Sequence, residues 1–161
     1  MSTDISLTVR SREENWLPVL ELAVEEVFEI MLGCRVKPVA STADQISEEF
    51  TAMVGLAGAL CGVLTVSCDK KTASVVAKCM LGPEIADSPD QVSDAMGEIC
   101  NMIAGNFKNK LAGTDGRCVL SVPTVIKGEE YCVRSLADGD SMRTVMHFQD
   151  SQLVISLQLH S

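Results

Sequence analysis

The sequence predicts an α+β fold, in which helices pack on one face of a largely antiparallel sheet. Apolar residues recur at helical spacing in the first part and the middle of the chain, whereas the C-terminal part alternates with the two-residue period of strands. Short turn signals join the strand-like segments, which favours hairpins and antiparallel pairing. A chain of 161 residues has the length of one domain with one sizeable core, so we expect a single domain over residues 1–161.

Composition narrows the functional classes. Hydrophobic residues make up 47% of the chain and aromatic residues only 4%, so we expect a folded protein with an aliphatic core. The formal net charge is −9 at pH 7, which argues against binding nucleic acid or an anionic membrane through a basic surface. An anionic partner must therefore be recognised by local geometry rather than by an overall positive field.

The first helix is predicted to end at Gly33, a suitable C-cap. Ser11 and Glu14 form the S-x-x-E pattern of a capping box near its start. Pro18 leaves a second start open, because proline favours the first turn of a helix and would move the start downstream. The apolar residues at helical spacing are Trp16, Leu20, Ala23, Val27 and Met31.

An uncharged stretch from Thr51 to Cys68 approaches the length of a transmembrane helix. Its valine and threonine residues favour strands, and Gly58 divides it into two halves of strand length. We therefore expect a buried hairpin with strands near residues 48–56 and 59–67. A membrane span is the alternative.

Two further helices are predicted from their capping residues. Asp69 is placed to cap a helix that ends at Leu81. Asp90 is placed to cap a longer helix that runs to about Leu111 and ends at Gly113. This second helix carries the residues that are most informative about function.

The remaining segments are predicted to be strands. Pro38 places the first of them at an edge of the sheet, because proline has no N–H to donate to a neighbouring strand. Residues 137–140 carry a strong turn signal, and residues 149–152 join the last two strands as a hairpin. The predicted strands are residues 34–40, 119–126, 130–136, 142–148 and 153–159.

The seven cysteines form no C-x-x-C pair and no cluster with histidine, so they carry no metal signature. Most lie in apolar runs, which is typical of small buried hydrophobic residues in a reducing cytosol. The first residues show no secretory signal, so we expect a cytoplasmic protein. The cysteines stand at positions 34, 61, 68, 79, 100, 118 and 132.

The long helix has an unusual solvent-facing side. At about 100° per residue, Val92, Met96, Ile99 and Ile103 face the core. The opposite side, within about 70°, carries Asp94, Glu98, Asn101, Gly105 and Lys108. Glu98 and Asn101 are three residues apart and project from one turn. The flanking charges of Asp94 and Lys108 are expected to be solvated.

Two glycines also interrupt this helix, at Gly97 and Gly105. Each costs roughly 1 kcal/mol relative to alanine, so something is expected to approach the backbone closely there. Close packing within the protein is the alternative. Asn106 points toward the core side of the helix, where a structural hydrogen bond is expected.

The segment from Gly97 to Asn106, with its E-x-x-N string and its glycines, resembles the CheC–CheX–FliY family of chemotaxis phosphatases, most closely CheX. Further likeness lies in residues 26–33, 54–58 and 73–82, so the resemblance covers most of the chain in the same order. It implies a CheX-like or CheC-like fold and a homodimer formed through sheet contacts. Because the E-x-x-N string is not repeated in the first helix, it also implies one active site per subunit.

The resemblance implies a protein aspartyl-phosphate phosphatase, a hydrolase that acts on a phosphorylated CheY-like response regulator in two-component signalling. It implies that Asn101 positions the attacking water and that Glu98 pairs with the receiver's active-site lysine. An amide suits the first role because it donates and accepts hydrogen bonds without changing charge. No cofactor of its own is implied, because the Mg²⁺ belongs to the response regulator.

Two other functions remain open. One is a module of the same fold that docks on a receiver domain without catalysis; the intact Glu98 and Asn101 favour the enzyme. The other is a scaffold that acts through a sheet edge, because the apolar, alternating C-terminal strands would invite pairing if unprotected. His147 and His160 pair with no serine or cysteine at a recognisable spacing, so neither is assigned a catalytic role.

Overall fold

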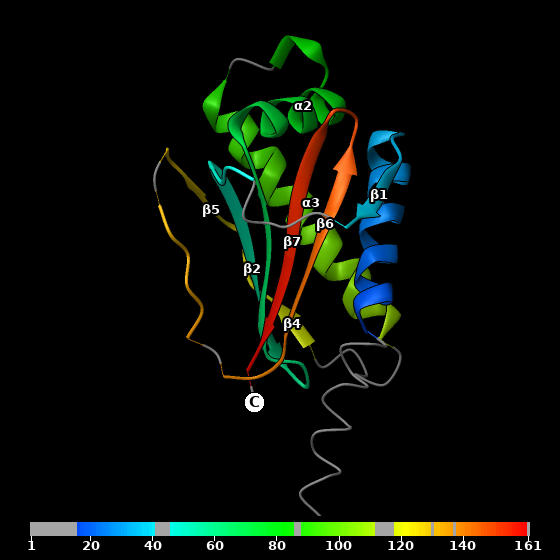
Figure 1. Ribbon diagram of the computed structural model, residues 1–161, viewed down its shortest axis with the longest axis vertical. Helices are drawn as coiled ribbons and strands as arrows, with labels where there is room; N and C mark the ends of the chain where they lie inside the picture. Colours follow the sequence, from blue (N-terminus) through cyan, green and yellow to red (C-terminus); the bar gives the residue numbers. More distant parts are fainter. Residues whose placement is uncertain are drawn as a thin grey trace, which may run out of the picture.

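The computed structural model describes residues 16–40, 46–85, 88–111, 118–129, 131–136 and 138–160. In this part of the chain, seven strands form one antiparallel sheet in the order β1-β6-β7-β3-β2-β4, and β5 also pairs with β2. Helices α2 and α3 pack against one face of this sheet (Figure 1). The predicted α+β class is therefore confirmed.

The strands are β1 (Val36–Val39), β2 (Phe50–Gly58), β3 (Gly62–Cys68), β4 (Cys118–Leu120), β5 (Thr124–Lys127), β6 (Ser141–Phe148) and β7 (Ser151–Leu159). The helices are an N-terminal helix (residues 16–27), which continues as the π-helical turn η1 (Phe28–Leu32), then α2 (Lys70–Leu81), the 3₁₀ turn η3 (Pro83–Ile85) and α3 (Pro89–Lys110).

The first helix ends where the sequence predicts. Gly33 adopts the left-handed conformation with φ 64°, and its N–H donates to the carbonyl oxygen of Glu29 over 3.1 Å. Glycine takes this conformation without a Cβ clash. The predicted capping box at Ser11 and Glu14 lies outside the described residues. Trp16 is already helical, so Pro18 lies in the first described turn.

The predicted hairpin is present as β2 and β3, with Leu56 opposite Gly62. A Cβ on Gly62 would lie 2.3 Å from the carbonyl oxygen of Gln158, so only glycine fits between β2 and β7 at this point. No described helix is both long and apolar enough to cross a membrane. The hairpin interpretation of the uncharged stretch is therefore confirmed.

Helix α2 is capped as predicted, because the Oδ1 atom of Asp69 accepts a hydrogen bond of 2.7 Å from the N–H of Thr72. The predicted cap of α3 at Asp90 is wrong. Ser88 is the N-cap, Pro89 is the first helical residue and Asp90 lies in the first turn. Proline favours this first position since its missing N–H would have no partner there. The predicted end at Gly113 lies outside the described residues; the helix itself ends at Lys110.

The two C-terminal strands are confirmed as β6 and β7, joined by a tight turn at Gln149, whose φ is 53°. They are not at an edge, because β6 lies between β1 and β7, and β7 lies between β6 and β3. The scaffold alternative, which needs an unprotected edge at these strands, therefore finds no support in the sheet order. The sheet ends instead at β1, where Pro38 stands as predicted, and at β4 and β5.

Two other strand predictions are wrong. Residues 119–126 do not form one strand; β4 and β5 flank an interruption at residues 121–123. Residues 131–136 form no strand, and Glu130 lies outside the described residues. Side chains 132–136 are all exposed. Pairing this segment as a strand would therefore not be stabilised by burial of an apolar face. The segment is tied to the sheet by Tyr131, whose hydroxyl is 2.8 Å from Oγ1 of Thr51.

The core is mainly aliphatic, as predicted, with its few aromatic rings in contact. Phe28 packs edge-on against Phe148 with centroids 5.2 Å apart. Three of the cysteines are buried as expected, Cys68, Cys100 and Cys118, whereas Cys61 and Cys132 are exposed. Cys61 is exposed because it lies in the turn between β2 and β3.

Candidate active site

Helix α3 lies across β2, β3, β4 and β5 and also contacts α2 (Figure 1). Its predicted core residues are confirmed: Val92, Met96, Ile99 and Ile103 are each at most 4% exposed. This packing fixes the rotation of the helix. The opposite side must therefore face away from the sheet.

Glu98 and Asn101 lie on that outward side, with Glu98 exposed and Asn101 partly buried. Their spacing of three residues places both side chains on one turn. No other described residue forms a hydrogen bond or an ion pair with either side chain. A carboxylate and an amide therefore stand together with their hydrogen-bonding capacity unused by the described part of the fold.

Of the two glycines of α3, only Gly97 lies where a Cβ would be tightly packed. A Cβ on Gly97 would lie 3.3 Å from the Cβ of Pro123, and one on Gly105 would lie 3.8 Å from Cδ1 of Leu120. Gly97 is itself buried. The close approach expected at Gly97 is therefore made by the segment between β4 and β5, which is the alternative of packing within the protein.

The segment from Ser121 to Pro123 was not singled out by the sequence analysis. The residue that could have identified this segment is Pro123, which interrupts an otherwise strand-like run. Proline is confined to edges and irregularities of a sheet. The segment matters for the site since it runs along one side of α3.

Asn106 has the structural role that its position on the helix predicts. Its amide donates to the carbonyl oxygen of Ala23 over 3.3 Å and to Oε2 of Glu26 over 3.0 Å. The same carboxylate accepts from Nζ of Lys110 over 2.7 Å. The hydrogen bonds from Lys110 and, second, from Asn106 hold the pKa of Glu26 below its ordinary value. This cluster ties α3 to the N-terminal helix.

Cys100 precedes Asn101 but takes no part in the exposed surface. Its thiol lies in the core, 3.5 Å from the carbonyl oxygen of Ala52 and 3.6 Å from that of Leu64. Burial raises the pKa of Cys100 to about 12, so the thiol stays protonated at neutral pH. A protonated, buried thiol is a poor nucleophile, which leaves Glu98 and Asn101 as the candidate pair.

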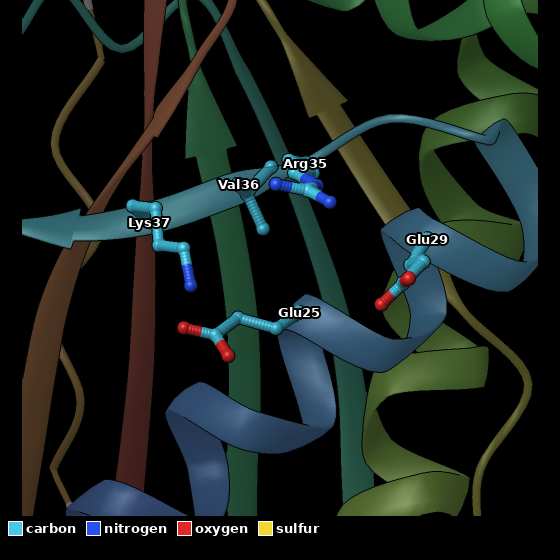
Figure 2. Close-up of a pocket in the computed structure, with 5 residues that line it drawn as sticks. All are labelled: Glu25, Glu29, Arg35, Val36 and Lys37. Atoms are coloured by element: carbon cyan, nitrogen blue, oxygen red, sulfur yellow. The ribbon is translucent and has the colours of Figure 1, made fainter.

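The candidate pair lies on an open helix surface and lines none of three hollows found elsewhere. Their volumes are about 190, 360 and 270 Å³. Figure 2 shows the first, where charged side chains of both signs point into the same space from the N-terminal helix, η1 and β1. Its lining residues are Glu25, Glu29, Arg35, Val36 and Lys37. In the described part of the chain, no group of three or more His, Cys, Asp or Glu side chains is placed to hold a metal ion.

Comparison with known proteins gives one family. The family model described as "Chemotaxis phosphatase CheX" matches residues 50–147, which include β2 through most of β6 and all of α3. A curated protein of Thermotoga maritima, "CheY-P phosphatase CheX", is 28% identical over 100 residues. That match covers 62% of this chain and 64% of the relative, which is less than two thirds of the relative's length.

Solved structures share the fold. A chemotaxis protein CheX from Desulfovibrio desulfuricans superposes with a TM-score of 0.79 at 23% identity, covering 91% of this chain and 99% of that one. A CheX from Borrelia burgdorferi, solved as a CheX–CheY–BeF₃–Mg²⁺ complex, gives a TM-score of 0.72 at 20% identity, covering 91% and 98%. At these identities the likeness shows the fold alone.

Proposed function

The chain belongs to the CheX family of chemotaxis phosphatases, and from this we propose that it hydrolyses the aspartyl phosphate of a phosphorylated CheY-like response regulator. The observation that carries the proposal is the pair Glu98 and Asn101, which stands on one exposed turn of α3 without a partner among the described residues. The name of the Thermotoga maritima relative and the CheY-bound structure from Borrelia burgdorferi support the same class of substrate.

Asn101 is the residue we propose to position the attacking water. An acyl phosphate is already reactive, so the helper protein contributes mainly by holding water in line with the phosphorus. An amide accepts a hydrogen bond from that water through its oxygen and donates another through its nitrogen. Because Asn101 is partly buried, its side chain has less rotamer freedom to lose when the water is bound.

Glu98 is proposed to pair with the lysine of the receiver's active site. A carboxylate and an ammonium form a charge-assisted hydrogen bond, which would set the register of α3 in the partner. Glu98 is exposed and one turn from Asn101, so both contacts can form together. The receiver would supply the Mg²⁺, which balances charge on the phosphoryl group.

The shape of the surface suits an aspartyl phosphate held within another protein. The pair lies on the outward side of a 22-residue helix and not within the three hollows described above. A convex helix enters a partner's pocket, whereas a cleft would accept a small free substrate. We therefore propose a protein substrate, met in the cytoplasm.

We also propose a homodimer formed through sheet contacts. The described sheet ends at β1 and at β4 with β5, so these strands are the edges available for pairing. Gel filtration with light scattering should give twice the mass of 17.3 kDa. A monomer across micromolar concentrations would exclude the dimer and leave the phosphatase proposal intact.

The alternative is a module that docks on the receiver without catalysis. The two functions are separated by the loss of acyl phosphate from phosphorylated CheY-like receivers, measured with and without the protein. We expect the wild type to accelerate the loss and Asn101→Ala to abolish the acceleration. Asn109→Ala is the matched control, because Asn109 is an exposed asparagine on the same helix outside the pair. Binding without acceleration by the wild type would favour the docking module.

A further inference from the structure

Two cysteines that the proposed phosphatase site does not use are in contact where η1 and α2 end. Cys34 lies in the link between Gly33 and β1, and Cys79 lies in the last turn of α2. The thiol of Cys79 forms a hydrogen bond with the thiol of Cys34. Their elements also meet, because η1 contacts α2. Folding therefore brings together two sulfur atoms that are far apart in the sequence.

The Cys34 sulfur is held in place by two further contacts. Its S–H donates to the carbonyl oxygen of Leu32 over 3.3 Å. The side-chain amide of Gln149, in the tight turn between β6 and β7, donates to the sulfur over 3.9 Å. Three parts of the fold therefore converge on this sulfur: the link before β1, the last turn of α2 and the β6–β7 turn.

The surroundings of this pair differ from those of the other cysteines. Cys34 and Cys79 are each partly exposed, so a small reagent reaches them, and both pack against the core, which limits their movement. Among the described residues, no second pair of cysteines is joined by a hydrogen bond. Burial raises the pKa of Cys79, and the neighbouring Cys34 thiol raises it further. Cys79 therefore stays protonated at neutral pH, which suits it to the second step of a thiol–disulfide exchange and leaves the first step to Cys34.

We propose that Cys34 and Cys79 form a reversible disulfide when the protein meets a low-molecular-weight disulfide such as oxidised glutathione. A disulfide requires the two sulfur atoms to approach to about 2 Å. The thiols are already in contact, and Cys34 lies outside the helices and strands, so the remaining movement falls on an irregular segment. Disulfides that form in a reducing compartment are usually transient and redox-sensing. The pair is therefore a modification site that is independent of the proposed phosphatase function.

The exchange balances in two steps. The Cys34 thiolate attacks one sulfur of oxidised glutathione and displaces the other half as a thiolate, which leaves a mixed disulfide on Cys34. Cys79 then loses its proton and attacks the Cys34 sulfur, which displaces the second glutathione. One S–S bond breaks and one S–S bond forms. The two protons of the protein thiols pass to the two released glutathione molecules, so the protein is oxidised and the glutathione disulfide is reduced.

The new bond connects the helices that cover the sheet. Asn106 and Lys110 already join α3 to Glu26 of the N-terminal helix, and α3 packs against α2. The disulfide joins the end of α2 to the link that follows the N-terminal helix. A cross-link between distant residues restricts the unfolded chain and so stabilises the fold. Oxidation should therefore raise the melting temperature without involving Glu98 or Asn101.

The test uses the whole protein with Cys61→Ser and Cys132→Ser, which removes the two exposed thiols that would otherwise form mixed disulfides. This parent protein is treated with oxidised glutathione. Free thiols are then counted, tryptic peptides are identified by mass spectrometry without reduction, and Tm is measured. We expect two free thiols to be lost, the peptides of Cys34 and Cys79 to be joined, and Tm to rise by roughly 5 °C or more. Dithiothreitol should reverse all three changes.

The matched variants are Cys34→Ser and Cys79→Ser in the same parent, each of which replaces one partly exposed sulfur atom with oxygen. Neither should give joined peptides or a rise in Tm. A parent that keeps both thiols free, or that retains glutathione on Cys34, would show that the two sulfurs do not close the bond and would overturn the proposal. Joined peptides that persist in Cys79→Ser would overturn it as well. None of these results bears on the phosphatase activity.

Discussion

Two asparagines five residues apart on α3 have the same side chain and opposite surroundings. Asn106 donates two hydrogen bonds to the N-terminal helix, to Ala23 and Glu26. The side chain of Asn101 forms no hydrogen bond with any other described residue. Asparagine is a poor helix former, so each position needs a reason to carry one. For Asn106 the reason is within the fold; for Asn101 we propose that the reason is a partner.

This contrast separates stability from function on a single helix. The Asn106 side chain contributes free energy of folding through its two hydrogen bonds, whereas the Asn101 side chain forms no hydrogen bond or ion pair within the described fold. Functional surfaces often keep polar groups uncommitted in this way, because they are satisfied only in the complex. Substitutions at the two positions should therefore change different measured quantities.

The largest expected effect is that of Asn101→Asp. The change is nearly isosteric, but it removes the donor and adds negative charge beside a phosphoryl group. We expect dephosphorylation of the receiver to fall at least about 100-fold, roughly 3 kcal/mol in the barrier, with the free energy of unfolding unchanged. Single-turnover kinetics and urea unfolding measure the two quantities. If Asn101→Asp kept the wild-type rate, the functional role proposed for Asn101 would be contradicted.

Asn106→Ala should give the reverse pattern. It removes the two hydrogen bonds that join α3 to the N-terminal helix, so we expect a loss of about 1–3 kcal/mol in the free energy of unfolding. The rate per folded molecule should stay within twofold of the wild type. Urea unfolding gives the first value and activity at low temperature the second. Unchanged stability would show that the hydrogen bonds contribute little.

Gly105→Ala tests whether a glycine near Asn101 on α3 lowers the stability of the fold. The added Cβ would meet Leu120 at 3.8 Å, an ordinary contact, so we expect a gain of up to ~1 kcal/mol in stability. Gly97→Ala should gain less, since its Cβ would lie 3.3 Å from Pro123. Chemical unfolding ranks the two. If Gly105→Ala were more stable but inactive, the result would show that Gly105 is needed for close contact with the partner.

The smallest expected effect is a pH dependence at Glu26. Its pKa is lowered in the folded protein, first by Lys110 and then by Asn106. A lowered carboxyl pKa stabilises the fold above the ordinary value of 4.5, and the contribution is lost as pH falls through the lowered pKa. Glu26→Gln should therefore be less stable than the wild type at pH 7, with the difference closing well below pH 4.5. A difference independent of pH would exclude this cause.

The helices were largely predictable because their signals are local. Apolar spacing fixed the rotation of α3, and this rotation placed Glu98 and Asn101 outward and Asn106 inward, as the structure has them. The error at Asp90 was a choice between two capping residues on either side of Pro89, and this proline at the first helical position makes Ser88 the cap.

The sheet was less predictable because strand pairing is decided by distant residues. Alternation identified β6 and β7 but not their place inside the sheet, which depends on β1 and β3 as neighbours. The reason for Gly97 could not be read from α3 alone, since the atom that needs the space belongs to Pro123. The interruption at residues 121–123 follows from its register with β2, which no local pattern specifies.

The most direct test is the rate of acyl-phosphate loss from a phosphorylated CheY-like receiver in the presence of Asn101→Ala or Asn106→Ala. The measurement is made at saturating protein and at a temperature where both variants are folded. We predict that Asn106→Ala accelerates the loss as the wild type does. With Asn101→Ala, the acyl phosphate should be lost only at the rate that the receiver shows without the protein. Wild-type acceleration by Asn101→Ala, or none by a folded Asn106→Ala, would contradict the assignment of the two asparagines.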